Sequence, residues 1–187
     1  MDSQRILVKV YATSSVDPER LIPVFHRFIR DKLFDEQMID VADYGHVKDG
    51  PGVALIGHAS DYFADLSEGR FGLLYTRKRQ APPPAERLAD AVRRALNGAR
   101  LVEKDPGCED IRFATNELLV KLTDRLNAPN DAAGFAALKA ELEPLAAKLF
   151  GAGATIEKVG EPRDALAARV KATNGPASVA DLLARLG

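Results

Sequence analysis

The sequence predicts an α+β fold in which helices cover an antiparallel sheet. Three observations predict it: segments of alternating polarity that are typical of strands, apolar stripes at helical spacing between them, and connections of hairpin length. Of the 187 residues, 46% are hydrophobic and 28% are charged. This composition is typical of a globular chain that buries a core, and not of a disordered one.

The first predicted strand covers residues 5–12, because its apolar residues alternate onto one face. A helix follows, and Pro23, which lacks an N–H, predicts that the regular part of this helix begins near that residue. Three more strands are then predicted, at residues 38–47, 53–66 and 71–79. A proline-rich break at residues 80–84 precedes an amphipathic helix over residues 88–99.

The second half of the chain begins with a similar strand. Residues 6–10, ILVKV, recur as LLVKL at residues 118–122, an offset of 112. An apolar helical stripe then runs from Phe135 to Leu149. The remaining predicted elements are a strand at 155–159, an alanine-rich strand at 165–172 that reads equally well as a helix, and a last helix that a capping box starts at Ser178.

Both halves therefore have the order strand, helix, strands, helix, which matches the ferredoxin-like sandwich. We predict two tandem ferredoxin-like (βαββα) modules with antiparallel sheets, at residues 1–105 and 109–187. The alternative is one irregular α+β sandwich without a true duplication.

Charge and composition exclude several classes of protein. The chain has 26 basic and 27 acidic side chains, so it has no net positive charge that would attract nucleic acid or an anionic membrane. Basic residues gather between Arg77 and Arg100, but the pair of Asp90 and Arg94 favours a solvated helix face over a nucleic-acid surface. The single cysteine, Cys108, excludes an intramolecular disulfide, and no segment resembles a signal peptide or a membrane span. We expect a soluble, cytoplasmic protein.

The candidate site lies between residues 40 and 79, which hold two of the three histidines and three of the four tyrosines. A hairpin that pairs Val47 with Val53 would put Asp40 and Tyr44 diagonal to His58. A tight turn at residues 67–70 would set Tyr62 opposite Tyr75 and Ser60 opposite Arg77. One open sheet face would then carry all seven side chains: Asp40, Tyr44, His58, Ser60, Tyr62, Tyr75 and Arg77.

Such a face predicts a protein that binds a small anionic or aromatic ligand. Arg77 would bind the anionic group, while the tyrosines and Ser60 would position the ligand. Whether the protein is an enzyme stays open; if it is, His58 would be the acid or base and Asp40 would orient it. The alternative is a non-enzymatic interaction module, in which the open face or the edge strands bind another protein or a second copy of the chain as a homodimer.

The sequence predicts no metal site. Asp43 with His46 and His58 with Asp61 repeat a spacing of three, which on a strand points the two side chains to opposite faces. Paired ferredoxin-like modules can house a haem with a histidine ligand, and by this analogy His58 or His26 could hold one here. No C-x-x-C-H motif supports it. No phosphate-binding glycine motif occurs, so the cofactor, if there is one, is unknown.

Overall fold

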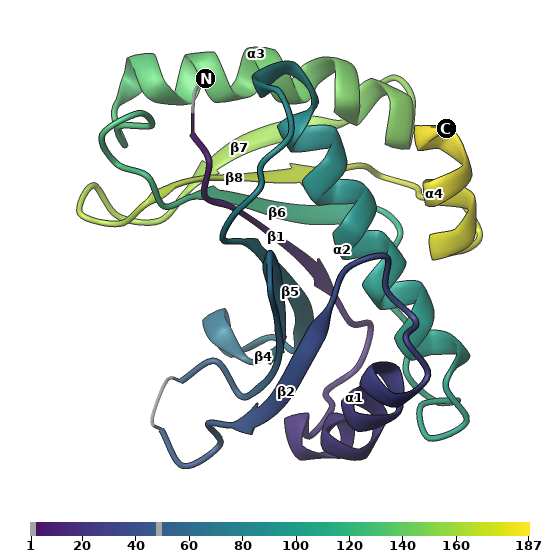
Figure 1. The fold of residues 1–187 in the computed structure, drawn as a ribbon. Coiled ribbons are helices and arrows are strands. Elements are labelled where there is room, and N and C mark those ends of the chain that lie inside the picture. Colours follow the sequence, from purple (N-terminus) through teal and green to yellow (C-terminus); the bar gives the residue numbers. More distant parts are fainter. Residues whose placement is uncertain (1–2, 48–49) are drawn as a thin grey trace.

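A computed structural model describes residues 3–47 and 50–187 and confirms the α+β class (Figure 1). Within these residues, eight strands form one antiparallel sheet and four α-helices pack on it. The strands are β1 (Ile6–Tyr11), β2 (Met38–Asp43), β3 (Val53–Gly57), β4 (Ser60–Asp65), β5 (Gly72–Arg77), β6 (Glu117–Leu122), β7 (Thr155–Val159) and β8 (Leu166–Lys171). The helices are α1 (Leu21–Arg30), α2 (Arg87–Lys104), α3 (Ala132–Phe150) and α4 (Val179–Leu186), with 3₁₀ turns η1 (Pro18–Arg20), η2 (Ser67–Gly69) and η3 (Pro84–Glu86).

The strand order is β2-β3-β4-β5-β1-β6-β8-β7, and β2 and β7 are the open edges. The two halves of the chain meet where β1 pairs with β6, with Val8 directly opposite Val120. The structure therefore has one continuous sheet, where the sequence predicted separate sheets in two modules.

The main core lies between the helices and one face of this sheet. Val8 and Val10 of β1 point to that face and are fully buried, as their alternation predicted. All four helices contribute buried residues to the same core, so they cover the same side of the sheet (Figure 1). The opposite face carries no α-helix in the described part of the chain, and we call it the helix-free face; its small apolar cluster contains Tyr11 and Leu119. Any ligand site on the helix side must therefore lie between packed layers.

Two predicted strands differ from the structure. The segment 53–66 is not one strand, because β3 ends at Gly57 and β4 starts at Ser60 after a tight turn. The segment 38–47 ends as a strand at Asp43, which pairs with Val53, so the expected pairing of Val47 with Val53 is wrong. Part of the connecting loop expected at residues 48–52, namely residues 48 and 49, lies outside the described residues.

The helix predictions need smaller corrections. Helix α1 begins at Leu21, and Pro23 is tolerated because it lies in the first turn, where backbone N–H groups have no intrahelical partner. The alanine-rich segment forms strand β8, which pairs with β6 and β7 on its two sides. Ser178 caps α4 as predicted, since its Oγ accepts a hydrogen bond from the Asp181 N–H at 3.2 Å. No helix of the described chain is both long and apolar enough to cross a membrane.

Candidate functional site

Four of the seven predicted site residues do come together. Tyr62 lies opposite Tyr75, and Ser60 lies opposite Arg77, so the predicted register of β4 and β5 is confirmed. The predicted face is wrong, however, because these side chains point to the side that α2 covers and are buried. The four residues thus form a buried group and not an open platform.

The two tyrosine rings are held rigidly. Their centroids are 5.2 Å apart, and the ring of Phe34 packs on Tyr62 at 4.7 Å. Helix α2 can approach this closely because Gly98 has no side chain: a Cβ there would lie 2.8 Å from the Tyr62 ring. Burial raises the pKa of both phenols above the ordinary range, so both are neutral at physiological pH.

Charged groups surround these rings. Arg77 donates to Asp90 at 2.6 Å, and Arg94 donates to Asp90 at 3.1 Å and to Asp35 at 2.8 Å. Asp90 and Arg94 thus form the predicted i,i+4 pair, but it is half-buried against the sheet and does not lie on a solvated helix face. The Ser60 hydroxyl donates to Glu36. We call this group the tyrosine–arginine cluster; it consists of Glu36, Ser60, Tyr62, Tyr75, Arg77, Asp90 and Arg94.

The electrostatics of the cluster favour charged arginine. Burial acts to lower the pKa of Arg94, but the charges of Asp90 and Asp35 outweigh it and raise the pKa overall. Two buried oxygens, Tyr75 Oη and Glu36 Oε2, have no hydrogen-bond partner among the described residues. Buried polar groups are rarely left unpaired, so the cluster can take up a further polar group.

A surface pocket opens directly over this cluster, and we call it the Tyr62 pocket. Its volume is about 360 Å³, and it lies between α2, α4 and the segment before β2. It is lined by Leu33, Asp35, Tyr62, Asp90, Arg93, Arg94, Asn97 and Leu183. The guanidinium of Arg93 has no ion pair or hydrogen bond within the described chain, unlike Arg94 beside it. The pocket therefore combines an apolar lining, Leu33 and Leu183 beside the buried Tyr62, with one cation that is unpaired within the described chain.

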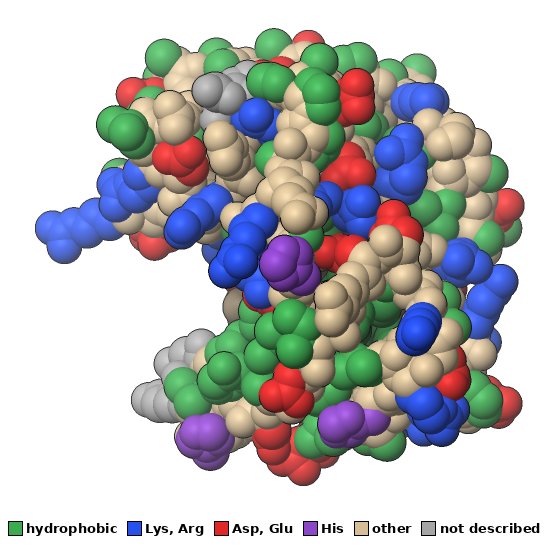
Figure 2. Space-filling view, in the orientation of Figure 1, with side chains coloured by type: hydrophobic (Ala, Val, Ile, Leu, Met, Phe, Trp, Pro, Cys, Tyr) green, Lys and Arg blue, Asp and Glu red, His purple; other side chains and the backbone are tan. Residues whose placement is uncertain are grey.

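The other three predicted residues lie elsewhere. Asp40 is exposed on the helix-free side, where it is paired with Ile56, and its Oδ1 accepts from the Val41 N–H. His58 is exposed in the turn between β3 and β4, and histidines lie on the outer surface in the space-filling view (Figure 2). Tyr44 lines a different pocket, beside η1 and η2.

The expected meeting of Asp40 and Tyr44 with His58 is therefore wrong, since Ala42 faces Ala54 and not His58. The acid–base roles of His58 and Asp40 stay a prediction without a shared face to support it.

Sequence reasoning missed a second polar group, on the helix-free face. Arg70 stacks on the ring of Tyr11 with its guanidinium 4.0 Å from the centroid, and it binds Glu117 with both nitrogens at 3.0 Å. Arg169 reaches Glu68 at 2.7 Å, so the network ties β5, β6 and β8 together across the two halves. Burial raises the pKa of Tyr11 to about 12. Lys9, the one polar residue between the core valines of β1, was a signal for a polar group on this face, but Arg169 could be found only from the register of β8.

Among the residues that the structure describes, no group of three or more histidine, cysteine, aspartate or glutamate side chains could hold a metal ion. Neither a scan against protein-family models nor a search of curated proteins found a match to this chain.

Proposed function

We propose that this protein binds a small aromatic carboxylate in the Tyr62 pocket. The observation that carries the proposal is the guanidinium of Arg93, unpaired within the described chain, at a pocket that Leu33 and Leu183 also line. A volume of about 360 Å³ lies within the range of small-molecule sites.

The one unpaired charge of the pocket favours an anion. The lining holds two acids and two arginines, so its net charge is zero. Three of these four groups are paired: Asp90 with Arg77 and Arg94, and Asp35 with Arg94, which also lies 3.5 Å from Glu36. The free charge that remains in the described lining is that of Arg93, which can bind a carboxylate with two parallel hydrogen bonds. Asn97 adds a neutral donor, because its Oδ1 already accepts from Arg100 and its NH₂ group is left to donate.

The apolar part of the lining selects a ring. Leu33 and Leu183 belong to the lining, and Leu33 is exposed. Tyr62 cannot move away from a ligand because Phe34 and Tyr75 pack on it. A flat ring in the pocket would cover Leu33 and Leu183, which removes their apolar area from water.

Calorimetric titration with benzoate tests the proposal. We expect saturable binding that Arg93→Gln weakens by about threefold to tenfold, the size of a partly exposed charge-assisted hydrogen bond. Lys104→Gln is the matched control, because it removes one exposed positive charge from the same helix about 16 Å away. Equal loss in both variants, or no binding to the unmodified protein, would contradict the proposal.

A second candidate function is an interaction module, and the helix-free face favours it. Leu7, Phe63 and Leu74 lie on neighbouring strands of that face and are only half-buried. Such an uncovered apolar group is typical of a surface that a protein partner covers. If a second copy covers it, Phe63→Lys lowers the mass in sedimentation at high protein concentration. A monomeric mass for the unmodified protein at the same concentration would contradict a homodimer.

We also propose the duplication into modules 1–105 and 109–187, and a cytoplasmic location. The pairing of Val8 with Val120 supports the duplication, because these residues are equivalent at the offset of 112 and a local two-fold axis would place them opposite each other. Co-expression of the two halves tests it: they should assemble into one complex through β1 and β6.

A further inference from the structure

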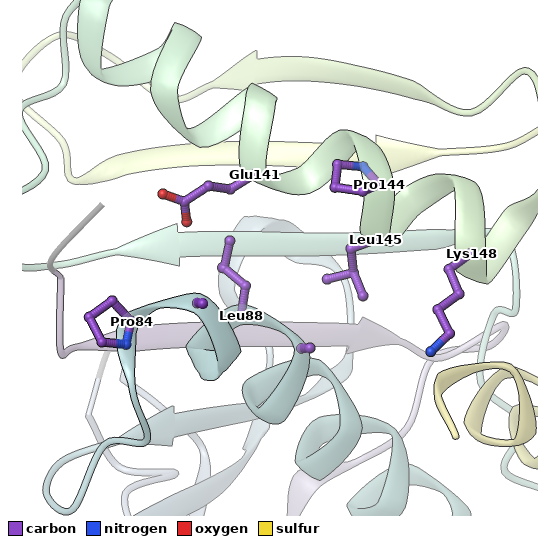
Figure 3. A pocket seen from close by; sticks show the side chains of 8 residues that line it. Pro84, Leu88, Glu141, Pro144, Leu145 and Lys148 are labelled. Atoms are coloured by element: carbon purple, nitrogen blue, oxygen red, sulfur yellow. The ribbon is translucent and has the colours of Figure 1, made fainter.

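A second, larger pocket lies between helices α2 and α3, and we call it the α2–α3 groove (Figure 3). Its volume is about 520 Å³. It is lined by Pro84, Ala85, Leu88, Ala89, Glu141, Pro144, Leu145 and Lys148. Leu88 of α2 and Leu145 of α3 point toward each other across it. None of these residues belongs to the tyrosine–arginine cluster or to the Tyr62 pocket.

The body of the groove is apolar. Its leucines are buried at its base, whereas Pro84, Ala85 and Pro144 expose their apolar atoms to water. The short side chains of Ala85 and Ala89 leave room between the helices. Covering such surface removes apolar area from water, which favours binding of an apolar group.

The two charged residues lie at opposite ends. Lys148 is seven residues after Glu141 on α3, which corresponds to about 10 Å along the helix. The Lys148 ammonium donates to the backbone oxygen of Leu186 at 2.8 Å, which fixes it beside α4 and leaves two further protons to donate. An anionic group is thus favoured at the Lys148 end of the groove.

We propose that this groove binds an alkyl monocarboxylate, with the carboxylate at Lys148 and the uncharged chain over Leu88 and Leu145. The size of the groove favours a small molecule over a protein segment, because its volume is that of a ligand pocket and a stable protein interface buries more than about 1,000 Å². A flexible chain fits better than a ring, since Leu88 and Leu145 lie between the Glu141 end and the Lys148 end of the groove, about 10 Å apart along α3 (Figure 3).

Backbone-amide NMR of the full chain, titrated with octanoate, tests the site. We expect shift changes at residues 84–89 and 141–148. Lys148→Gln should weaken binding by about twofold to fivefold, as expected for an exposed ion pair. Lys139→Gln, which removes an exposed charge from the same helix outside the groove, should leave the affinity unchanged.

Two further arms make the outcome decisive. Ala89→Phe fills the groove and should abolish the octanoate shifts while the rest of the spectrum keeps its native dispersion. Octylamine, which has the same chain with the opposite charge, should bind more weakly than octanoate. Octanoate shifts outside the groove, equal binding of the amine, or no effect of Ala89→Phe would overturn the proposal. Benzoate binding at the Tyr62 pocket should survive Ala89→Phe, so the two sites can fail independently.

Discussion

The contact between Gly98 and Tyr62 gives a prediction whose sign is not obvious. In an exposed helix, Gly→Ala stabilises a protein by about 1 kcal/mol, because alanine loses less backbone entropy on folding. In α2, however, the new Cβ would lie 2.8 Å from Tyr62 Cε1 and 2.9 Å from Leu73 Cδ2. Real Cβ atoms do not approach other atoms this closely, so one of the neighbours has to shift.

The magnitude follows from how little the ring can move. Phe34 and Tyr75 pack on Tyr62, and its hydroxyl donates weakly to the Arg94 backbone oxygen at 3.5 Å. Overpacking a rigid site costs about 2–3 kcal/mol. After the helix-propensity gain is subtracted, Gly98→Ala should lower the free energy of unfolding by about 1–2 kcal/mol.

Urea unfolding of single and double variants checks this reasoning. In a Tyr62→Phe background the ring edge remains, so Gly98→Ala should cost the same as in the unmodified protein. In a Tyr62→Leu background the ring is gone, and Gly98→Ala should become neutral or stabilising. A stabilising Gly98→Ala in the unmodified protein, or an equal cost in the Tyr62→Leu background, would refute the close packing of α2 on β4.

Three more predictions follow from buried groups. Lys9 is fully buried and contacts Asp65 at 2.5 Å. Lys9→Met leaves that carboxylate buried without its partner, so it should lower the free energy of unfolding by about 3–5 kcal/mol. A loss below about 1 kcal/mol in urea unfolding would contradict a buried ion pair. Burial holds the pKa of Tyr11 at about 12, above its unfolded value; its stabilising contribution is therefore complete below about pH 10 and is lost between about pH 10 and 12. In Tyr11→Phe the free energy of unfolding should therefore fall less between about pH 10 and 12 than in the unmodified protein. An equal fall in both proteins would contradict this. Burial raises the pKa of Cys108 to about 11, so a thiol reagent at neutral pH should label it only at the rate of unfolding; rapid labelling of the native protein would mean that the thiol is exposed.

The register of the Tyr62 hairpin could be predicted because a short connection fixes which residues face each other. The face could not be predicted, since each side of β4 mixes polar and apolar residues: Ser60, Tyr62 and Ala64 on one side, and Asp61, Phe63 and Asp65 on the other. The Tyr62 side is the one on which α2 packs, and Gly98 permits this close contact. That contact joins residues far apart in the sequence, and no local pattern encodes it.

The site around His58 was mispredicted for a local reason. The segment 53–66 is apolar at most positions, and its turn-forming residues Gly57, Ser60 and Asp61 are spread out, so the tight turn at His58 had no strong sequence signal. The turn takes His58 out of the sheet. Ala42 faces Ala54 for a separate reason, which is that Asp43 and not Val47 pairs with Val53. A shift of this kind moves every side chain that was placed by counting from the loop.

The proposed binding of a small aromatic carboxylate in the Tyr62 pocket is tested most directly by backbone-amide NMR during titration with benzoate, because this measurement locates the ligand without assuming an activity. We expect saturable shift changes at residues 33–36, 90–97 and 183. In Arg93→Gln the same shifts should need about threefold to tenfold more benzoate to reach saturation. Absence of shifts at those residues, or the same titration curve in Arg93→Gln, would contradict it.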